Sequence, residues 1–281
     1  MRKVVLPTDF SESAWNALHY AMELFKYDIT EWYLMHAFAD EVYENNAINV
    51  RAKFDELKAQ VQAVTEKQLE EWADKIKHVA ANPKHSVKTI AAFGSLVDAV
   101  NDLVEDENID LVVMGTQGAT GKKELTFGTQ TLQVIKYVKC PVLAIPNKFH
   151  EMQPTRVLFP TDYLVPYKRR ELKLLSTLAK NFTTKITLLY VSKFDKRSFR
   201  QEDNKQFLVS CLEENQCEEI QLKEDDVTWA IHDFMEKTPV DFLVMVNSRH
   251  SYLEHVLHTS KIEKMSLGSQ IPFLVLQNLP R

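Results

Sequence analysis

The sequence predicts an α/β fold made of two tandem copies of one strand–helix pattern. Three observations support this prediction: short apolar runs alternate with segments of helical periodicity, the same motifs occur twice, and helix-opening residues follow the apolar runs. Strands that alternate with helices of about ten residues or more form right-handed βαβ units, whose parallel sheet carries helices on both faces. The apolar runs are unbroken, which agrees with burial on both faces of the sheet.

Two pairs of matching segments reveal the duplication. Val4–Phe10 (VVLPTDF) corresponds to Val157–Tyr163 (VLFPTDY) at an offset of 153 residues. Asp110–Met114 (DLVVM) corresponds to Asp241–Met245 (DFLVM) at an offset of 131. The second copy is therefore 22 residues shorter than the first between these two motifs.

We expect two domains, residues 1–148 and 154–281, and each element of the first has its own signal. The apolar run Lys3–Leu6 stops at a proline and is followed by Thr-Asp, a good helix opening. Apolar residues recur at helical spacing through Ser11–Phe25 and again through the charged segment Ile48–His78, which predicts two helices. The apolar run Trp32–Ala37 between them predicts the second strand.

The remaining elements of the first domain follow the same rule. The short apolar runs Val87–Ala92, Leu111–Met114 and Val142–Ile145 have the length of strands. Leu96–Glu105 and Thr129–Val138, which lie between them, show helical spacing. The second domain repeats the order, with elements predicted at Arg156–Phe159, Lys173–Ala179, Ile186–Val191, Phe207–Glu213, Glu219–Lys223, Val227–Glu236, Phe242–Val246, Ile262–Leu267 and Phe273–Leu276.

Composition restricts the class of protein. The 281 residues are 45% hydrophobic and 26% charged, as in soluble globular proteins, and the net charge of −5 argues against a dedicated nucleic-acid binder. No apolar run approaches the roughly 20 residues that a membrane span needs, and the N-terminus lacks a signal-peptide core. The three cysteines form no CxxC pair, so a cytoplasmic location is expected.

Glycines concentrate after the fourth predicted strand. Four of the six glycines in the chain lie within 14 positions, from Gly115 to Gly128. Gly115 would let the backbone turn tightly at the end of a strand and lie close to a ligand. Gly128 and Thr129 open a helix, where free backbone N–H groups and the helix dipole favour a phosphate. The hydroxyls of Thr129 and Thr131 would add two donors.

The spacing Gly115-x2-Gly118-x9-Gly128-Thr129 resembles the Gly-x2-Gly-x9-Gly-Ser/Thr motif of ATP-binding universal stress proteins. The segments PTDFS, which begins at Pro7, and CPVL, which begins at Cys140, are also similar to that family, and the resemblance covers nearly the whole chain. It implies two Rossmann-like (flavodoxin-like) domains, each with a five-stranded parallel sheet of order 3-2-1-4-5. In that order strands 1 and 4 are neighbours, and a ligand crevice opens at their carboxyl ends.

The resemblance also implies an adenine nucleotide site in the first domain. Asp9 would contact the ribose or the adenine, and Ala37 would meet the base through its backbone. The other expected binding residues border the nucleotide or its phosphates: Pro7, Met114, Gly115, Gly118, Gly128, Thr129, Gln130 and Thr131. The family often has a small apolar residue where Gln130 stands. ATP, with or without Mg²⁺, is the expected ligand, and ADP and AMP remain alternatives.

Structural interpretations of the same residues stay open. Asp9 could be only a helix cap, with Glu12 completing a capping box. Thr129 is an N-cap candidate whether or not a phosphate is present. The cluster of His250, His255 and His258 offers no evident carboxylate or thiol as a third ligand, so no metal site is expected.

The second domain has lost the glycine loop. At the offset of 131, Val246 replaces the first glycine of the motif, Arg249 the second and Thr259 the third. Because side chains stand where backbone would approach the phosphates, we expect no ATP binding of this kind there, although Arg249 and His250 could hold another anion. The second domain is instead expected to pair with the first as an internal pseudo-dimer. The candidate edge strands are Val142–Ile145 and Phe273–Leu276, since edge strands require a partner.

Three functions are compatible with these observations. The favoured one is a nucleotide-binding regulatory protein of the stress response, in which ATP held by the first domain changes its shape or its partners. A slow ATP-hydrolysing enzyme is the second, although the sequence shows neither a paired carboxylate with a positioned base nor a Walker-type lysine and hydroxyl. A ligand-free interaction scaffold is the third. A homodimer of the whole chain and an unidentified protein partner both remain open.

Overall fold

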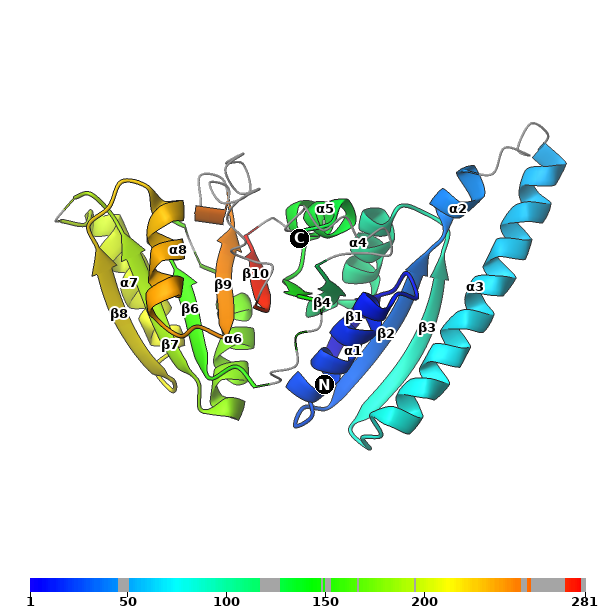
Figure 1. The fold of residues 1–281 in the computed structure, drawn as a ribbon, viewed down its shortest axis with the longest axis horizontal. Helices are drawn as coiled ribbons and strands as arrows, with labels where there is room; N and C mark the ends of the chain where they lie inside the picture. Colours follow the sequence, from blue (N-terminus) through cyan, green and yellow to red (C-terminus); the bar gives the residue numbers. More distant parts are fainter. Residues whose placement is uncertain are drawn as a thin grey trace.

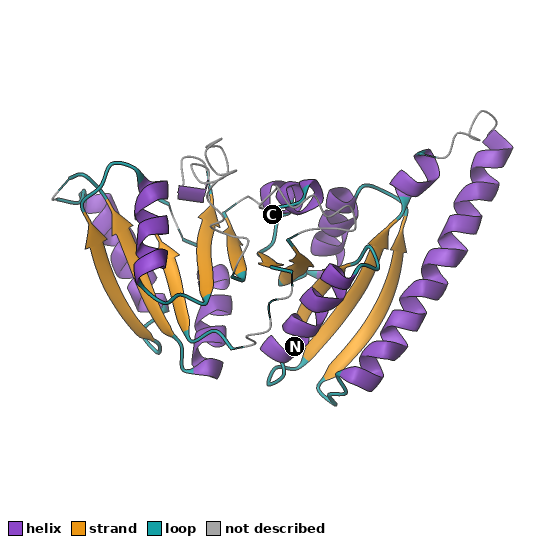
Figure 2. Ribbon diagram, in the orientation of Figure 1, coloured by secondary structure: helices purple, strands orange, loops and turns teal. Residues whose placement is uncertain are grey.

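The structure, a computed structural model, describes residues 1–44, 51–116, 127–147, 149, 153–165, 167–194, 196–248, 252–253 and 271–278. These residues form one ten-stranded sheet that carries helices on both faces (Figure 1 and Figure 2). The strands are β1 (Arg2–Pro7), β2 (Thr30–Ala37), β3 (His85–Ala92), β4 (Leu111–Gly115), β5 (Val142–Ile145), β6 (Arg156–Pro160), β7 (Lys185–Val191), β8 (Gln216–Leu222), β9 (Phe242–Asn247) and β10 (Phe273–Gln277). The helices are α1 (Glu12–Leu24), α2 (Ala39–Tyr43), α3 (Arg51–Val79), α4 (Leu96–Glu107), α5 (Thr129–Tyr137), α6 (Arg169–Phe182), α7 (Phe199–Cys211) and α8 (Val227–Lys237).

The strand order contains the expected fold twice. The sheet runs β3-β2-β1-β4-β5-β10-β9-β6-β7-β8. In the first half, which is β1 to β5 with its helices, all neighbouring strands are parallel in the order 3-2-1-4-5. The second half, β6 to β10, has the same order and the same parallel pairing. Two tandem Rossmann-like units are therefore confirmed.

The two halves join edge to edge in the middle of the sheet. β5 and β10 pair antiparallel, with Leu143 opposite Leu274, and this pair connects two sheets that are otherwise parallel (Figure 1). These are the two candidate edge strands of the sequence, and each covers the other's unpaired backbone groups. The halves are thus arranged as an internal pseudo-dimer.

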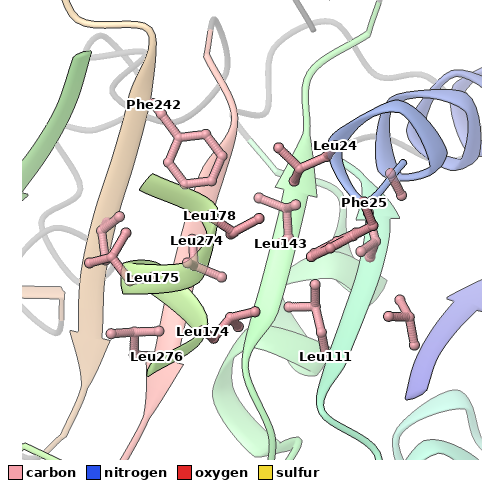
Figure 3. Packing of buried hydrophobic residues seen from close by; sticks show 14 of the residues in the cluster. Leu24, Phe25, Leu111, Leu143, Leu174, Leu175, Leu178, Phe242, Leu274 and Leu276 are labelled. Carbon is pink, nitrogen blue, oxygen red and sulfur yellow. The ribbon is translucent and has the colours of Figure 1, made fainter. Parts of the chain in front are cut away.

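Two apolar cores, one on each face of the sheet, run through both halves. One core packs β-strand side chains against α1, α3, α6 and α7, and the other packs them against α4, α5 and α8. Figure 3 shows Leu24 and Phe25 of the first half and Leu174 and Leu178 of the second half near the junction. All four are at most 5% exposed, and burying a side chain of this size contributes about 1.5–3 kcal/mol. The junction is therefore apolar core and not a solvated contact between two domains.

The turn that ends the first strand has the same geometry in both halves. Phe10 and Tyr163 have left-handed backbone angles, with φ of 59° and 56°. The hydroxyl of Thr8 accepts the N–H of Phe10 at 2.9 Å, and the hydroxyl of Thr161 accepts the N–H of Tyr163 at 3.1 Å. The Pro-Thr-Asp motif recognised in the sequence is therefore a repeated turn that compensates a strained aromatic residue.

An aspartate directly before the fourth strand makes the same contact in both halves. The carboxylate of Asp110 accepts the N–H of Lys3 at 3.0 Å, and that of Asp241 accepts the N–H of Arg156 at 2.8 Å. Each aspartate thereby fixes the start of the neighbouring first strand. Asp110 also forms an ion pair of 2.8 Å with Arg170 of α6, which links the two halves at the amino ends of their strands.

Element boundaries differ from the predicted ones where the chain is polar. α7 begins at Phe199, eight residues before its predicted start, because Ser198 and Gln201 form a capping box ahead of a solvated stretch without apolar periodicity. The short helix α2 is absent from the sequence prediction. The predicted helix Ile262–Leu267 lies outside the described residues. Within the described residues, no helix combines the length and the apolar character that a membrane crossing requires.

Candidate functional site

A cavity opens at the carboxyl ends of β1, β2 and β4, where the doubly wound topology places ligands. Its volume is about 230 Å³. Nine of the ten expected binding residues line it, namely Pro7, Asp9, Ala37, Met114, Gly115, Gly128, Thr129, Gln130 and Thr131. The tenth, Gly118, lies outside the described residues. The cavity therefore unites residues that lie far apart in the sequence.

Asp9 lies at the exposed rim of this cavity, directly after β1. Its carboxylate accepts hydrogen bonds from the backbone N–H of Ser11 at 3.1 Å and from the Ser11 hydroxyl at 2.5 Å. Ser11, not Asp9, is the N-cap of α1, and its hydroxyl accepts the N–H of Ala14 at 3.2 Å. The interpretation of Asp9 as the cap itself is wrong, because Ser11 caps the helix and Asp9 accepts hydrogen bonds from this capping serine.

The start of α5 forms the opposite wall. Gly128 is the N-cap, and its N–H donates to the carbonyl of Thr116 at 2.7 Å. Thr129 is the first helical residue, so its interpretation as the N-cap is wrong. No side chain caps this helix. The first hydrogen bond of the helix runs from the N–H of Leu132 to the carbonyl of Gly128. The N–H groups of the three residues before Leu132 have no partner inside the helix, and they carry its positive dipole end.

The Thr131 hydroxyl, which the sequence suggested as a phosphate donor, forms a hydrogen bond within the fold. The side chain is 2% exposed, and its hydroxyl donates to the carbonyl of Gly115 at 3.0 Å. This bond ties the first turn of α5 to the end of β4. Thr129 is exposed and lines the cavity.

Gly115 is required by the packing of α1 against the end of β4. A Cβ atom at this position would collide with the Ser13 hydroxyl and lie 3.2 Å from the Ser13 carbonyl oxygen of α1. Only a glycine lets α1 approach the end of β4 this closely. The sequence suggested a tight turn and contact with a ligand, whereas the structure adds a neighbouring helix.

His36 is a site residue that the sequence interpretation missed. It is buried, lines the cavity near the end of β2, and its ring lies 4.9 Å from the ring of Phe10. Its Nδ1 atom is 2.6 Å from the carbonyl of Thr8, and its Nε2 atom is 2.6 Å from a carboxylate oxygen of Glu41. Because a carbonyl only accepts, Nδ1 carries a proton. His36 therefore connects the end of β1 to α2 across one wall of the cavity.

The described lining carries negative rather than positive side chains. Asp9 and Asp40 are both exposed at the cavity, and no lysine or arginine is among its described lining residues. Lys122 and Lys123 lie outside the part of the chain that the structure describes. Within the described wall, the group suited to an anion is therefore the N-terminus of α5.

No metal cluster is visible in the ranges that the structure covers. These residues contain no group of three or more histidine, cysteine, aspartate or glutamate side chains placed to hold a metal ion. His250, His255 and His258, considered from the sequence, lie outside the described residues.

The corresponding cleft of the second half is filled. Its cavity measures only about 10 Å³ and is lined by the repeated turn residues Thr161 and Asp162. Val246, which the sequence aligned with Gly115, also lines it. The other two replacements of the glycine motif, Arg249 and Thr259, lie outside the described residues, as does His250.

The fold and the crevice between strands 1 and 4 define a doubly wound α/β protein, and the cavity of its first half lies where this class of fold places ligands. The model of the Universal stress protein family matches residues 1–146. The chain belongs to this family.

Relatives support the same assignment. One universal stress protein of Methanocaldococcus jannaschii is 26% identical over 155 residues, which cover 52% of this chain and 96% of the relative. Another from the same organism is 28% identical over 149 residues, which cover 51% of this chain and 81% of that protein. A universal stress protein of Archaeoglobus fulgidus has a similar structure, with a TM-score of 0.70 over 98% of this chain and 96% of the other, at 19% identity. At that identity the likeness shows the shared fold alone.

Proposed function

We propose that this universal stress protein binds one adenine nucleotide, ATP being the expected ligand, in its first half. The supporting observation is the cavity that brings nine of the expected binding residues together at the carboxyl ends of the strands. We assign the binding domain to residues 1–148 and a mainly structural partner domain to residues 154–281. Nucleotide occupancy would then regulate the shape or the partners of a cytoplasmic stress-response protein.

The walls of the cavity suit different parts of a nucleotide. Ala37 ends β2 at the cavity and would meet the base through its backbone, while Met114 contributes an apolar side chain to the lining. The exposed carboxylate of Asp9 suits ribose hydroxyls, which donate hydrogen bonds. The phosphates would meet the N–H groups of Thr129 and Gln130 at the start of α5.

The size of the cavity sets the depth of binding. At about 230 Å³ it is smaller than the ~300–1,000 Å³ of a typical small-molecule site. We infer that it encloses the base and the ribose, and that the phosphates extend over the exposed first turn of α5. Mg²⁺, if it accompanies ATP, would bind at the phosphates.

Substitution of Gly128 tests this proposal. The backbone angles at Gly128, φ −63° and ψ 156°, are open to any residue, so Gly128→Val is compatible with the backbone conformation. Its side chain would intrude on the phosphate position, and we expect the affinity for ATP to fall at least tenfold, about 1.4 kcal/mol. Titration calorimetry with ATP and Mg²⁺ measures the change.

A matched control is available in the same half. A Cβ atom at Gly94 meets no other atom within 4 Å, and Gly94 is not among the residues that line the cavity, so Gly94→Val makes the same chemical change outside the lining. We expect it to bind ATP like the unmodified protein. Equal affinity in all three proteins would remove the case for a phosphate site at α5.

A further inference from the structure

The second half keeps the backbone frame of the nucleotide site. In the first half, the N–H of Thr8 donates to the carbonyl of Met35 at 2.8 Å, and Met35 lies two residues before Ala37 in β2. In the second half, the N–H of Thr161 donates to the carbonyl of Leu189 at 2.9 Å, and Leu189 lies two residues before Val191 in β7. Val191 therefore occupies in the second half the position that Ala37 occupies in the first.

A tyrosine side chain of the second half reaches this position. Tyr252 is 8% exposed, lines the small remaining cavity with Leu253, and its hydroxyl donates to the carbonyl of Val191. Burial is the main cause that raises the pKa of Tyr252, so the hydroxyl remains a donor. An aromatic ring with a donor to the second-strand carbonyl thus lies where the proposed site of the first half would receive an adenine ring and its amino group.

A second tyrosine completes the closure. Tyr167 lines the same cavity, and its hydroxyl is hydrogen-bonded to the hydroxyl of Thr161 in the repeated turn. Val165 also contacts this space. The volume consequently falls from about 230 Å³ in the first cleft to about 10 Å³ in the second.

We propose that the second cleft is a purine-base site held closed by the chain's own Tyr252, whose phenol takes the position of the base. The proposal rests on the proposed function of the first half, because the position of the base is inferred from Ala37. The ligand class that fits the opened cleft is a free base such as adenine, since Val246 projects a side chain where the first half has Gly115. A tyrosine that merely fills apolar core would leave a cavity for apolar aromatic molecules and not for a polar purine base.

Truncation of Tyr252 tests the proposal, with adenine as the probe. Equilibrium dialysis with radiolabelled adenine counts the molecules bound per chain. We expect one in the unmodified protein, two in Tyr252→Ala, and one in Tyr252→Phe, whose ring still fills the cleft. A Tyr252→Ala protein that binds no more adenine than Tyr252→Phe would overturn the proposal.

The outcomes separate this proposal from the proposed function. If the unmodified protein and Tyr252→Phe bind no adenine but Tyr252→Ala binds one, the first site fails and the second is supported. If Tyr252→Ala unfolds, thermal unfolding is measured with adenine and with p-cresol, which replaces the lost phenol. Rescue by p-cresol, together with a stabilisation by adenine that exceeds the one adenine gives to Tyr252→Phe, supports a base site in the second cleft. Rescue by p-cresol with no such excess for adenine, or rescue by neither compound, contradicts it.

Discussion

The Nε2 atom of His36 lies 2.6 Å from a carboxylate oxygen of Glu41, and this contact fastens α2 to the wall of the candidate nucleotide cavity. The other ring nitrogen is held by the carbonyl of Thr8 at the end of β1. One buried imidazole thus fixes the relative position of two elements whose neighbouring residues, Asp9 and Asp40, face the cavity.

Replacement of His36 by phenylalanine should weaken nucleotide binding. His36→Phe keeps an aromatic ring but removes both hydrogen bonds, so the Thr8 carbonyl and α2 lose their fixed positions. We expect the affinity for ATP to fall about tenfold, ~1.4 kcal/mol, in a titration. Glu41→Gln is the control, because its side-chain amide offers Nε2 both a donor and an acceptor. It should cost less than half as much free energy. An unchanged affinity in His36→Phe would show that the imidazole does not position the site.

Gly115→Ala should destabilise the protein by steric conflict with α1. The added Cβ would meet the side chain and the carbonyl oxygen of Ser13, and overpacking of this kind costs about 1–3 kcal/mol. Urea denaturation measures the loss. Gly94→Ala, with open space around its Cβ, should stay within about 0.5 kcal/mol of the unmodified protein.

A double-mutant cycle identifies the source of that conflict. The Ser13 hydroxyl has no hydrogen-bond partner among the described residues, so Ser13→Ala should be nearly neutral. In the Ser13→Ala background the cost of Gly115→Ala should be smaller, because one of the two colliding groups is gone. Strict additivity would place the conflict elsewhere.

Thr131 and Thr129 should respond differently to the same substitution. Thr131→Val removes the buried hydroxyl that the Gly115 carbonyl accepts and should lower the free energy of unfolding by about 1–2 kcal/mol. Thr129→Val acts at an exposed position and should change it by less than about 0.5 kcal/mol. Chemical denaturation of both variants compares them, and equal effects would contradict the structural role of the Thr131 hydroxyl.

Acid should weaken the first half through Glu31. The Tyr33 hydroxyl donates to the Glu31 carboxylate at 2.6 Å, and this bond, followed by the contact with Lys88, holds the pKa of Glu31 below its usual 4.5. A carboxyl with a depressed pKa in the folded state stabilises the protein above its ordinary pKa. That stability is lost as the pH falls through the folded value.

Tyr33→Phe tests this pH dependence. The variant loses the donor to Glu31, so its free energy of unfolding should be about 1–2 kcal/mol lower at pH 7. Between pH 7 and about pH 3 it should lose less stability than the unmodified protein, because the pKa of Glu31 is then closer to its unfolded value. Denaturation at both pH values gives the comparison, and parallel losses in the two proteins would argue against the role of Tyr33.

Much of the fold could be predicted because repeated motifs and apolar periodicity in the sequence indicate its strands and helices. The duplicated Pro-Thr-Asp turn, the buried strands and the junction of Val142–Ile145 with Phe273–Leu276 all carry such signals. The start of α7 could not be located, since a capping box and a solvated face leave no apolar period. The short helix α2 has only 5 residues, too few to show an apolar periodicity in the sequence.

The candidate site was only partly predictable for a physical reason. Glycines and a helix opening mark backbone positions, and the structure brings the described ones together at the cavity. His36 gave one weak signal, a single polar residue near the end of an apolar strand, and its partners are visible only in three dimensions. The filling of the second cleft by Tyr252 could not be foreseen, because the lost glycines identify what is missing and not what replaces it.

The most direct test of the account is the nucleotide content of the freshly purified protein, completed by a titration with ATP and Mg²⁺. The protein is denatured, and any released nucleotide is identified by chromatography and mass spectrometry and counted per chain. The account predicts one adenine nucleotide per chain at saturation, lost in Gly128→Val and retained in Gly94→Val. Two nucleotides per chain would contradict the closed second cleft, and none after both extraction and titration would contradict the nucleotide site itself.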